Sequence, residues 1–364
     1  MSLILLLACT GKPSVVTPDD SEPQVDDSDP PVDDSQPEDC LTTPEAISPK
    51  DGAKGVYYRS DLSVQFTDAV STASFTVRAI RPVEGQAQLG STGSLDKEAS
   101  FEAHEPSLTV EWNASREIAT LETDGLHANT RYALDIRVCG QGFKSTFSTD
   151  AYGDPLEIAP EDLVGHTFVV ELSKVSFTEP AGFGSFLAVY LDVPILIGVV
   201  SVDGDDLDML GAQGRLTSSG RYVQKKTQTL DDEQKYWVPT WDFSGVDFSQ
   251  SPFWAGDTDK IELRYDGAFI PVYDFHIEGT FSPDGESFGG GRIWGLGDTR
   301  DMATLFNSDD EDYVCGLVET AGASCEVCPE DGEKYCLFLR GEDIEADRER
   351  GLVLEELGDG LYEE

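Results

Sequence analysis

Short runs in which apolar and polar side chains alternate are the feature that most restricts the fold of this chain. The clearest run is Leu62–Phe66, and similar runs lie at Ser74–Ala79, Leu108–Trp112, Ile118–Thr123, Tyr132–Val138 and Phe143–Phe147. A period of two is typical of half-buried strands, and turn-forming residues separate these runs. About seven short strands in about 110 residues predict a β-sandwich over residues 40–150.

Several motifs in this region resemble the bacterial Ig-like module of the SbsA type. They are the entry Ser48-Pro49-Lys50-Asp51-Gly52-Ala53-Lys54-Gly55-Val56, the strand Val64-Gln65-Phe66, the segment Asn129-Thr130-Arg131-Tyr132 and the closing Phe147-Ser148-Thr149. The resemblance implies an Ig-like sandwich that spaces, displays or adheres, and it carries over no active-site residue. Tyr132 opens a late strand after a turn, which is typical of a tyrosine corner whose hydroxyl bonds to upstream backbone.

A second β-rich region is expected over residues 156–364. Strands are predicted at Thr167–Leu172, Ile261–Tyr265, Ile270–Phe281 and Phe288–Leu296, and the apolar run Phe186–Val202 predicts a core helix followed by a core strand. Ser282-Pro283-Asp284-Gly285 predicts a hairpin turn, and the triple glycine 289–291 predicts a bulge or a barrel corner. With short helices at 184–191 and 301–306, we expect a mainly antiparallel sandwich or barrel. The fold class is therefore mainly β.

The start of the chain has a different composition. Leu6-Leu7-Ala8-Cys9 ends a short apolar run and resembles the lipobox of bacterial lipoproteins. The resemblance implies that residues 1–9 are a signal segment and that Cys9 carries lipid. Because Thr10 rather than Asp follows, it also implies anchoring in the outer membrane. An ordinary apolar N-terminus is the alternative, since no Lys or Arg precedes the run.

Residues 10–39 contain a seven-residue repeat, and each copy begins with Asp-Asp-Ser, at residues 19, 26 and 33. Paired aspartates and prolines prevent a helix, and the segment has too few apolar residues to bury a core. We therefore predict a disordered acidic stalk.

The charge of the chain excludes one class of partner. Seventy Asp and Glu face 25 Lys and Arg, which gives a formal net charge of −45. Such a surface repels phosphate backbones, so that nucleic-acid binding is not expected. No glycine-rich phosphate loop with its lysine occurs, which argues against a nucleotide enzyme.

Seven cysteines leave six for disulfides if Cys9 is lipidated. Cys40 and Cys139 would connect the entry of the sandwich to a late strand. Cys315, Cys325, Cys328 and Cys336 would form two disulfides that staple the segment 315–336, with three pairings open. Four thiolates around one zinc ion are the alternative, although the expected second C-x2-C is missing.

Aromatic residues gather around Tyr236-Trp237 and Trp241, with Trp254 close behind. Such side chains stack on sugar rings or line apolar pockets, so these four residues are the candidate ligand-binding residues. The alternative is that they pack between strands.

No catalytic residue, metal site or cofactor site is predicted. The four histidines are scattered, and no Gly-x-Ser-x-Gly motif occurs. We expect an exported cell-envelope lipoprotein with a structural, adhesive or ligand-binding role, and non-enzymatic work is favoured over catalysis. Its expected partners are the membrane, through the lipid anchor, and an envelope polysaccharide or another envelope protein. The alternatives are an extracellular polysaccharide hydrolase that uses carboxylates of the C-terminal region, and a barrel that holds an apolar ligand.

Overall fold

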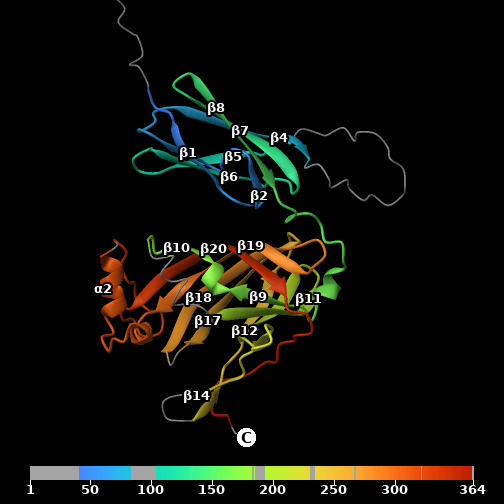
Figure 1. Cartoon of the computed structure of the whole chain (residues 1–364), viewed down its shortest axis with the longest axis vertical. Helices are drawn as coiled ribbons and strands as arrows, with labels where there is room; N and C mark the ends of the chain where they lie inside the picture. The colour runs from blue at the N-terminus through green and yellow to red at the C-terminus, as the bar shows by residue number, and fades with distance from the viewer. Residues whose placement is uncertain are drawn as a thin grey trace, which may run out of the picture. The chain divides into compact units, whose positions relative to one another are not determined.

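A computed structural model describes residues 41–82, 104–182, 184, 193–229, 234–265, 268–320 and 322–362. These residues form a β-sandwich and a β-barrel (Figure 1), so the predicted mainly β fold is confirmed. The expected signal segment, the lipidation of Cys9, the acidic stalk and Cys40 lie outside the described residues. Most of the helix expected over 184–191 lies outside them too.

The sandwich contains two four-stranded sheets, ordered β1-β3-β6-β5 and β2-β8-β7-β4. The strands are β1 (Pro44–Ser48), β2 (Ala53–Val56), β3 (Leu62–Phe66), β4 (Ala73–Pro82), β5 (Leu108–Trp112), β6 (Ile118–Thr123), β7 (Thr130–Val138) and β8 (Gln141–Thr149). All neighbours are antiparallel except β2 and β8. Every strand predicted here from the alternation is present.

The alternating side chains build the sandwich core as expected. In β3, Leu62, Val64 and Phe66 are buried, whereas the residues between them face outward. The predicted tyrosine corner is confirmed, because the backbone N–H of His127 donates to the hydroxyl oxygen of Tyr132 at 2.7 Å. The Tyr132 ring is fully buried and stacks on Phe147.

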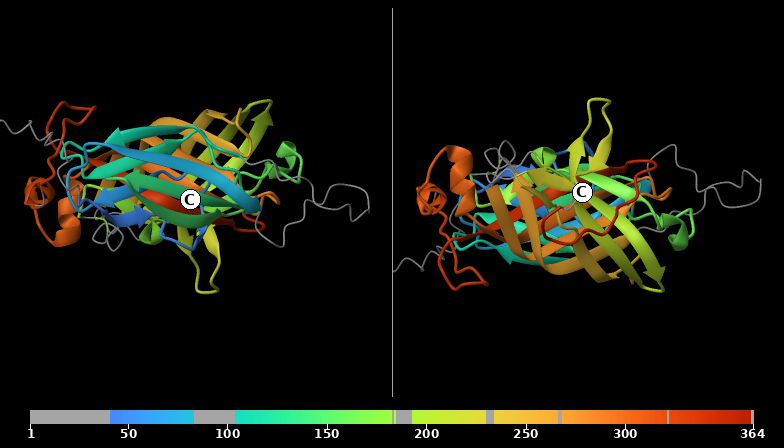
Figure 2. Two further views of the ribbon diagram at one scale, coloured as in Figure 1. Left: turned by 90° about the horizontal axis from the view of Figure 1, so that it is seen from above. Right: turned by 90° about the horizontal axis from the view of Figure 1, so that it is seen from below.

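The second region is a closed antiparallel barrel. Its ring strands are β9 (Thr167–Glu171), β11 (Pro194–Asp203), β12 (Asp206–Leu216), β16 (Trp241–Asp247), β17 (Phe253–Tyr265), β18 (Ala268–Phe281), β19 (Ser287–Asp298) and β20 (Cys336–Arg348). Each strand pairs with the next, and β20 pairs back with β9, which closes the ring. Green β9 and red β20 lie side by side in Figures 1 and 2.

Shorter strands and helices lie outside the ring of this barrel. They are the strands β10 (Ser176–Glu179), β13 (Tyr222–Gln224), β14 (Thr227–Thr229) and β15 (Lys235–Trp237), the 3₁₀ helices η1 (Pro160–Leu163), η2 (Leu172–Lys174) and η3 (Asp301–Phe306), and the helix α2 (Tyr313–Glu319). The strands predicted in this region form parts of β9, β17, β18 and β19, and the helix expected over 301–306 is η3. The described half of the apolar run 186–202 is the core strand β11.

The interior of the barrel is packed with side chains. Phe168, Phe243, Trp254, Phe281 and Phe288 are among its fully buried residues. A remaining apolar void has a volume of about 30 Å³. Eight-stranded barrels are just wide enough for side chains to fill, which agrees with this core.

Two predicted glycine features are present in the barrel. Gly285 ends the turn between β18 and β19 with a φ of 67°, and its N–H donates to the carbonyl of Ser282. The β19–β20 register shifts on both sides of Gly291, and Gly290 has a φ of 61°. A left-handed φ favours glycine, so the triple glycine forms the expected bulge.

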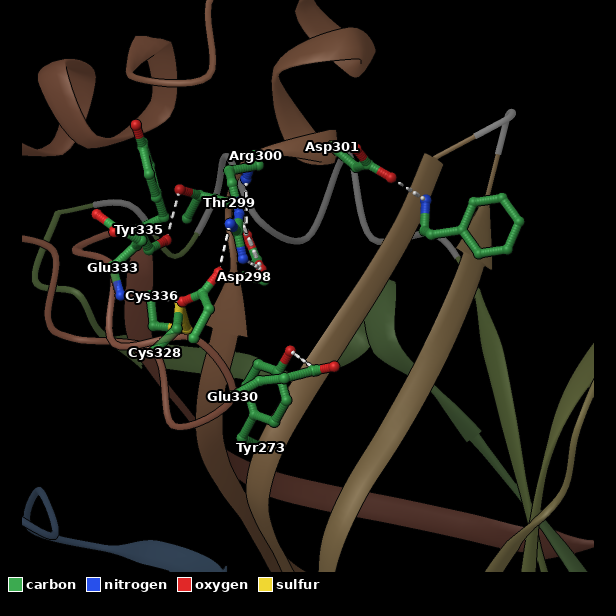
Figure 3. A network of polar contacts seen from close by, with 12 residues as sticks. Tyr273, Asp298, Thr299, Arg300, Asp301, Cys328, Glu330, Glu333, Tyr335 and Cys336 are labelled. Carbon is green, nitrogen blue, oxygen red and sulfur yellow. Dashed lines mark hydrogen bonds and ion pairs between the residues drawn. A yellow bond between two sulfur atoms is a disulfide. The ribbon is translucent and has the colours of Figure 1, made fainter.

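The cysteine-rich segment is stapled by two disulfides, Cys315–Cys325 and Cys328–Cys336. The structure thus selects one of the three pairings, and no metal-binding cluster occurs among the described residues. Arg300 binds both carboxylate oxygens of Asp298 and also contacts Asp331 at 2.6 Å, whereas Tyr273 donates to Glu330 at 2.6 Å (Figure 3). These contacts fix the stapled loop to β18 and to the end of β19.

The C-terminal segment 349–362 crosses the outside of the barrel. Leu352 and Leu354 pack on Val169, Leu196 and Ala212, which lie on the outer faces of β9, β11 and β12. Further along, the segment bonds to the backbone of β15. No helix among the described residues has the length and apolar character that crossing a membrane requires.

Candidate functional site

The candidate site is a cavity of about 470 Å³ at one end of the barrel, called here the mouth cavity. It lies where β9 ends, β11 begins and β12 continues into its hairpin with β13. Its lining residues are Glu171, Val193, Pro194, Gln213, Gly214, Arg215, Leu216, Tyr222 and Lys225. Small-molecule sites have volumes of about 300–1,000 Å³ and often lie in the mouths of barrels.

The mouth cavity exists because β12 extends beyond its neighbour β16. Gly211 pairs with Trp241, the first residue of β16. Beyond this point β12 pairs with β13 instead, and Gly214 lies opposite Gln224. The ring of strands therefore has a local opening between β12 and β17.

The side chain of Gln213 bridges this opening. Its Nε2 donates to the carbonyl oxygen of Arg264 at 2.7 Å, and the Arg264 N–H donates to its Oε1 at 3.0 Å. The buried amide thus pairs with the backbone of β17 as a neighbouring strand would. Gln213 satisfies two backbone groups and gives the cavity a fixed polar wall.

Lys225 lies in the same wall. Its Nζ donates to the carbonyl oxygen of Arg264 at 2.8 Å and to Oε1 of Gln228 at 2.9 Å. Among the described residues no carboxylate forms an ion pair with it. Burial, and after it the positive charge of Arg264, lowers the pKa of Lys225 to about 8. The adjacent Lys226 is exposed and pairs with Glu355 at 2.6 Å.

Arg264 holds the wall in place from behind. Its side chain is buried and binds Glu262, the carbonyl of Trp237 and Asp359 at 2.5, 2.8 and 2.9 Å. These partners belong to β17, β15 and the C-terminal segment. One arginine therefore joins three parts of the chain around the backbone atoms that position Gln213 and Lys225.

The mouth cavity has an excess of positive charge. Arg215 and Lys225 are cationic, whereas Glu171 is the one carboxylate that the described residues contribute to the lining, and it is bound by Lys174 at 2.7 Å. Arg215 is exposed and has no ion-pair partner within the described part of the chain. Because the chain as a whole carries a charge of −45, this local excess is a specific feature. It suits a small anionic ligand.

The structure does not bring the four predicted aromatic residues together. Trp241 and Trp254 lie in the barrel core, because they point inward from β16 and β17. Tyr236 and Trp237 lie on β15 against the C-terminal segment, where the Trp237 ring meets the Tyr362 ring at 4.8 Å. Of the four, Trp237 reaches the wall of the mouth cavity, through its carbonyl on Arg264. Ligand binding by these residues stays a prediction.

Cysteine pairing is described for five of the six predicted disulfide cysteines. Cys139 is disulfide-bonded, but the proposed partner Cys40 lies outside the described residues, so this pair stays a prediction. The other four cysteines form the two disulfides of the stapled segment.

A separate polar cluster lies on β17, β18 and β19. His276 Nδ1 lies 2.6 Å from Asp257 Oδ1, its Nε2 lies 3.3 Å from Glu278 Oε2, and Arg292 also binds Glu278. The Trp294 ring stacks on His276 with ring centroids 3.7 Å apart. Burial alone would lower the pKa of His276, but the two carboxylates outweigh it and raise the pKa.

The sequence alone did not point to the residues of the mouth cavity or to those of the polar cluster around His276. Lys225 and Lys226 are neighbouring lysines in a strongly acidic chain, which is a usable signal. Gln213 carries no such signal, because its role depends on where β16 begins.

Comparisons with known proteins add little to this geometry. No protein-family model matches the chain, and a comparison with curated proteins gives no match. Among solved structures, the crystal structure of a DUF4784 family protein from Bacteroides caccae matches with 6% identity and a TM-score of 0.20. The match covers 71% of this chain and 77% of that chain. A likeness at this TM-score carries no argument about the function of the chain.

Proposed function

We propose that this protein is an exported, lipid-anchored binding protein of the cell envelope that holds a small anionic ligand in the mouth cavity. The observation that carries the ligand-binding part is the cavity itself, which has a suitable volume and two cationic side chains, Arg215 and Lys225. Its wall is held by hydrogen bonds before any ligand arrives. Such preorganisation lowers the entropic cost of binding.

The envelope part of the proposal has separate support. Leu6-Leu7-Ala8-Cys9 resembles a lipobox, and the acidic repeat that follows has the composition of a stalk. The disulfides Cys315–Cys325 and Cys328–Cys336 suit an oxidising compartment. The resemblance of residues 44–150 to an Ig-like module of surface proteins points in the same direction.

The two alternative functions have weaker support. A barrel that carries an apolar ligand needs an interior cavity, and the interior void of about 30 Å³ is far smaller than a small-molecule site. A polysaccharide hydrolase needs two facing carboxylates, whereas within the described part of the chain Glu171 alone contributes a carboxylate to the lining of the mouth cavity.

Ligand binding is tested by a thermal-shift and calorimetry screen of the full chain with small carboxylates, uronic acids and sugar phosphates. A specific ligand at a hundredfold excess over its Kd stabilises the folded protein by about 2.7 kcal/mol. Arg215→Ala should abolish the effect. The matched control is Arg137→Ala, which removes an exposed arginine from β7 of the sandwich. No stabilisation by any anion, or equal loss in both variants, would contradict the proposal.

The anchor is tested by cell fractionation of the chain with Cys9 and of Cys9→Ser. Lipid on Cys9 predicts that the first form stays with membranes and that the variant is released as soluble protein. Equal membrane retention of both forms would contradict lipidation at this residue without affecting the binding proposal.

A further inference from the structure

The hydrogen bonds of Lys225 Nζ suit the neutral amine as well as the ammonium ion. A protonated lysine has three N–H donors, whereas a neutral amine has two N–H donors and one lone pair. The described surroundings of Lys225 Nζ supply two acceptors, the Arg264 carbonyl and Gln228 Oε1. Both acceptors are uncharged, so neither provides a counter-ion for the half-buried ammonium form.

Besides its bond to Cε, this nitrogen has three tetrahedral positions. Two of them hold the N–H groups already described, and the third determines whether the amine can react. Lys225 lines the mouth cavity together with Arg215, Tyr222 and Glu171. With both N–H groups donated to fixed acceptors, the lone pair of the neutral amine remains for a molecule in the cavity. The guanidinium of Arg215 provides a cation for a carboxylate on the same molecule.

We propose that Lys225 binds its ligand covalently as an imine, and that the ligand is a small carbonyl compound with a carboxylate, such as a 2-oxo acid. This inference rests on the proposed function, because it uses the same cavity. The amine lone pair attacks the carbonyl carbon and forms a C–N bond. The π bond of the carbonyl opens onto its oxygen as this C–N bond forms. Both amine protons then move to the oxygen, the remaining C–O bond breaks to release water, and the electron pair left on nitrogen completes the C=N double bond. The reaction is reversible and needs no oxidant or reductant.

The acidity of Lys225 supports this chemistry. A pKa of about 8 leaves roughly a fifth of the amine neutral at pH 7.4, against roughly a thousandth for an ordinary lysine. The reactive form is therefore about 200-fold more abundant at Lys225 than at a lysine of normal pKa. Lysines that form Schiff bases are activated by such desolvation and by neighbouring cations.

The experiment traps the imine in the full-length protein. Glyoxylate is the probe, and sodium cyanoborohydride reduces any imine to a stable carboxymethyl amine, which is located by fragment-ion mass spectrometry. Lys226 is the internal control, because it is adjacent in sequence but exposed and paired with Glu355. We expect Lys225 to be labelled at least about tenfold faster than Lys226, since its lower basicity offsets part of the advantage in neutral amine.

Two variants and one substitute probe separate the possible outcomes. Lys225→Arg keeps the charge and should lose the label, whereas Arg215→Ala should slow labelling by glyoxylate but not by the uncharged glycolaldehyde. Equal labelling of Lys225 and Lys226 would overturn the imine. If anions then still stabilise the protein, the proposed binding function stands, and if they do not, both proposals fail.

Discussion

The tyrosine corner of the sandwich allows a quantitative test of how the fold is held together. Tyr132→Phe removes one oxygen atom and leaves the ring, which is buried against Phe147, in place. The backbone N–H of His127, which donates to that oxygen at 2.7 Å, then loses its partner. The substitution therefore isolates a single hydrogen bond.

The expected loss of stability is about 1 kcal/mol. A typical intramolecular hydrogen bond contributes about 0.5–1.5 kcal/mol, and an orphaned donor costs more only if water cannot reach it. His127 is exposed, so water can reach its N–H in part and the larger penalty does not apply. For a domain of about 100 residues, 1 kcal/mol corresponds to a fall in Tm of about 4–8 °C.

Hydrogen exchange measured by mass spectrometry gives the local readout. Peptides from β6 and β7 should exchange about fivefold faster in Tyr132→Phe, while barrel peptides stay unchanged. Tyr58→Phe is the matched control, because the Tyr58 hydroxyl makes no hydrogen bond to any described residue. If both variants behaved alike, the corner hydrogen bond would contribute nothing and the reasoning would be refuted.

Two further predictions concern the barrel. Because the pKa of His276 is raised above its usual 6.5 or so, its stabilisation is fully present below about pH 6.5 and is lost as the pH rises through its folded pKa. Asp257→Asn should lower that pKa in an NMR titration, by a modest amount since the Asp257 side chain is 81% exposed, and an unchanged pKa would contradict the assignment. Replacing Cys328 and Cys336 by serine should cost about 2.5 kcal/mol in chemical denaturation, from the entropy of the closed loop. A loss below about 1 kcal/mol would show that the polar contacts of Arg300 hold the loop without the disulfide.

Much of the fold was accessible from the sequence because the signals are local. The alternation in Leu62–Phe66 depends on adjacent residues, and Ser282–Gly285 forms its turn with bonds inside the same segment. The pairing of the four C-terminal cysteines was not accessible, because it depends on how the segment folds back on itself and not on the spacing of the cysteines. The structure pairs each cysteine with its neighbour in sequence.

The candidate site could not be predicted from the sequence, and the reason is physical. Gln213 belongs to β12, Lys225 directly follows β13 and Arg264 belongs to β17, and they meet because β16 begins only at Trp241. A strand boundary is set by tertiary pairing, and local patterns locate it poorly. The aromatic sequence around Trp241 and Trp254 predicts a binding surface, whereas the strand register turns both side chains into the core.

The closure of the barrel has a consequence for the order in which the chain can fold. Val170 in the first strand of the ring pairs with Ala346 in the last, so the ring cannot close until nearly the whole chain is available. Contacts between residues so distant in sequence form slowly. Until then β9 and β20 present two open edges, which are templates for pairing with other chains. A truncation before residue 336 would therefore destabilise the barrel more than its length suggests, since it would convert a closed ring of strands into an open sheet that is prone to aggregate.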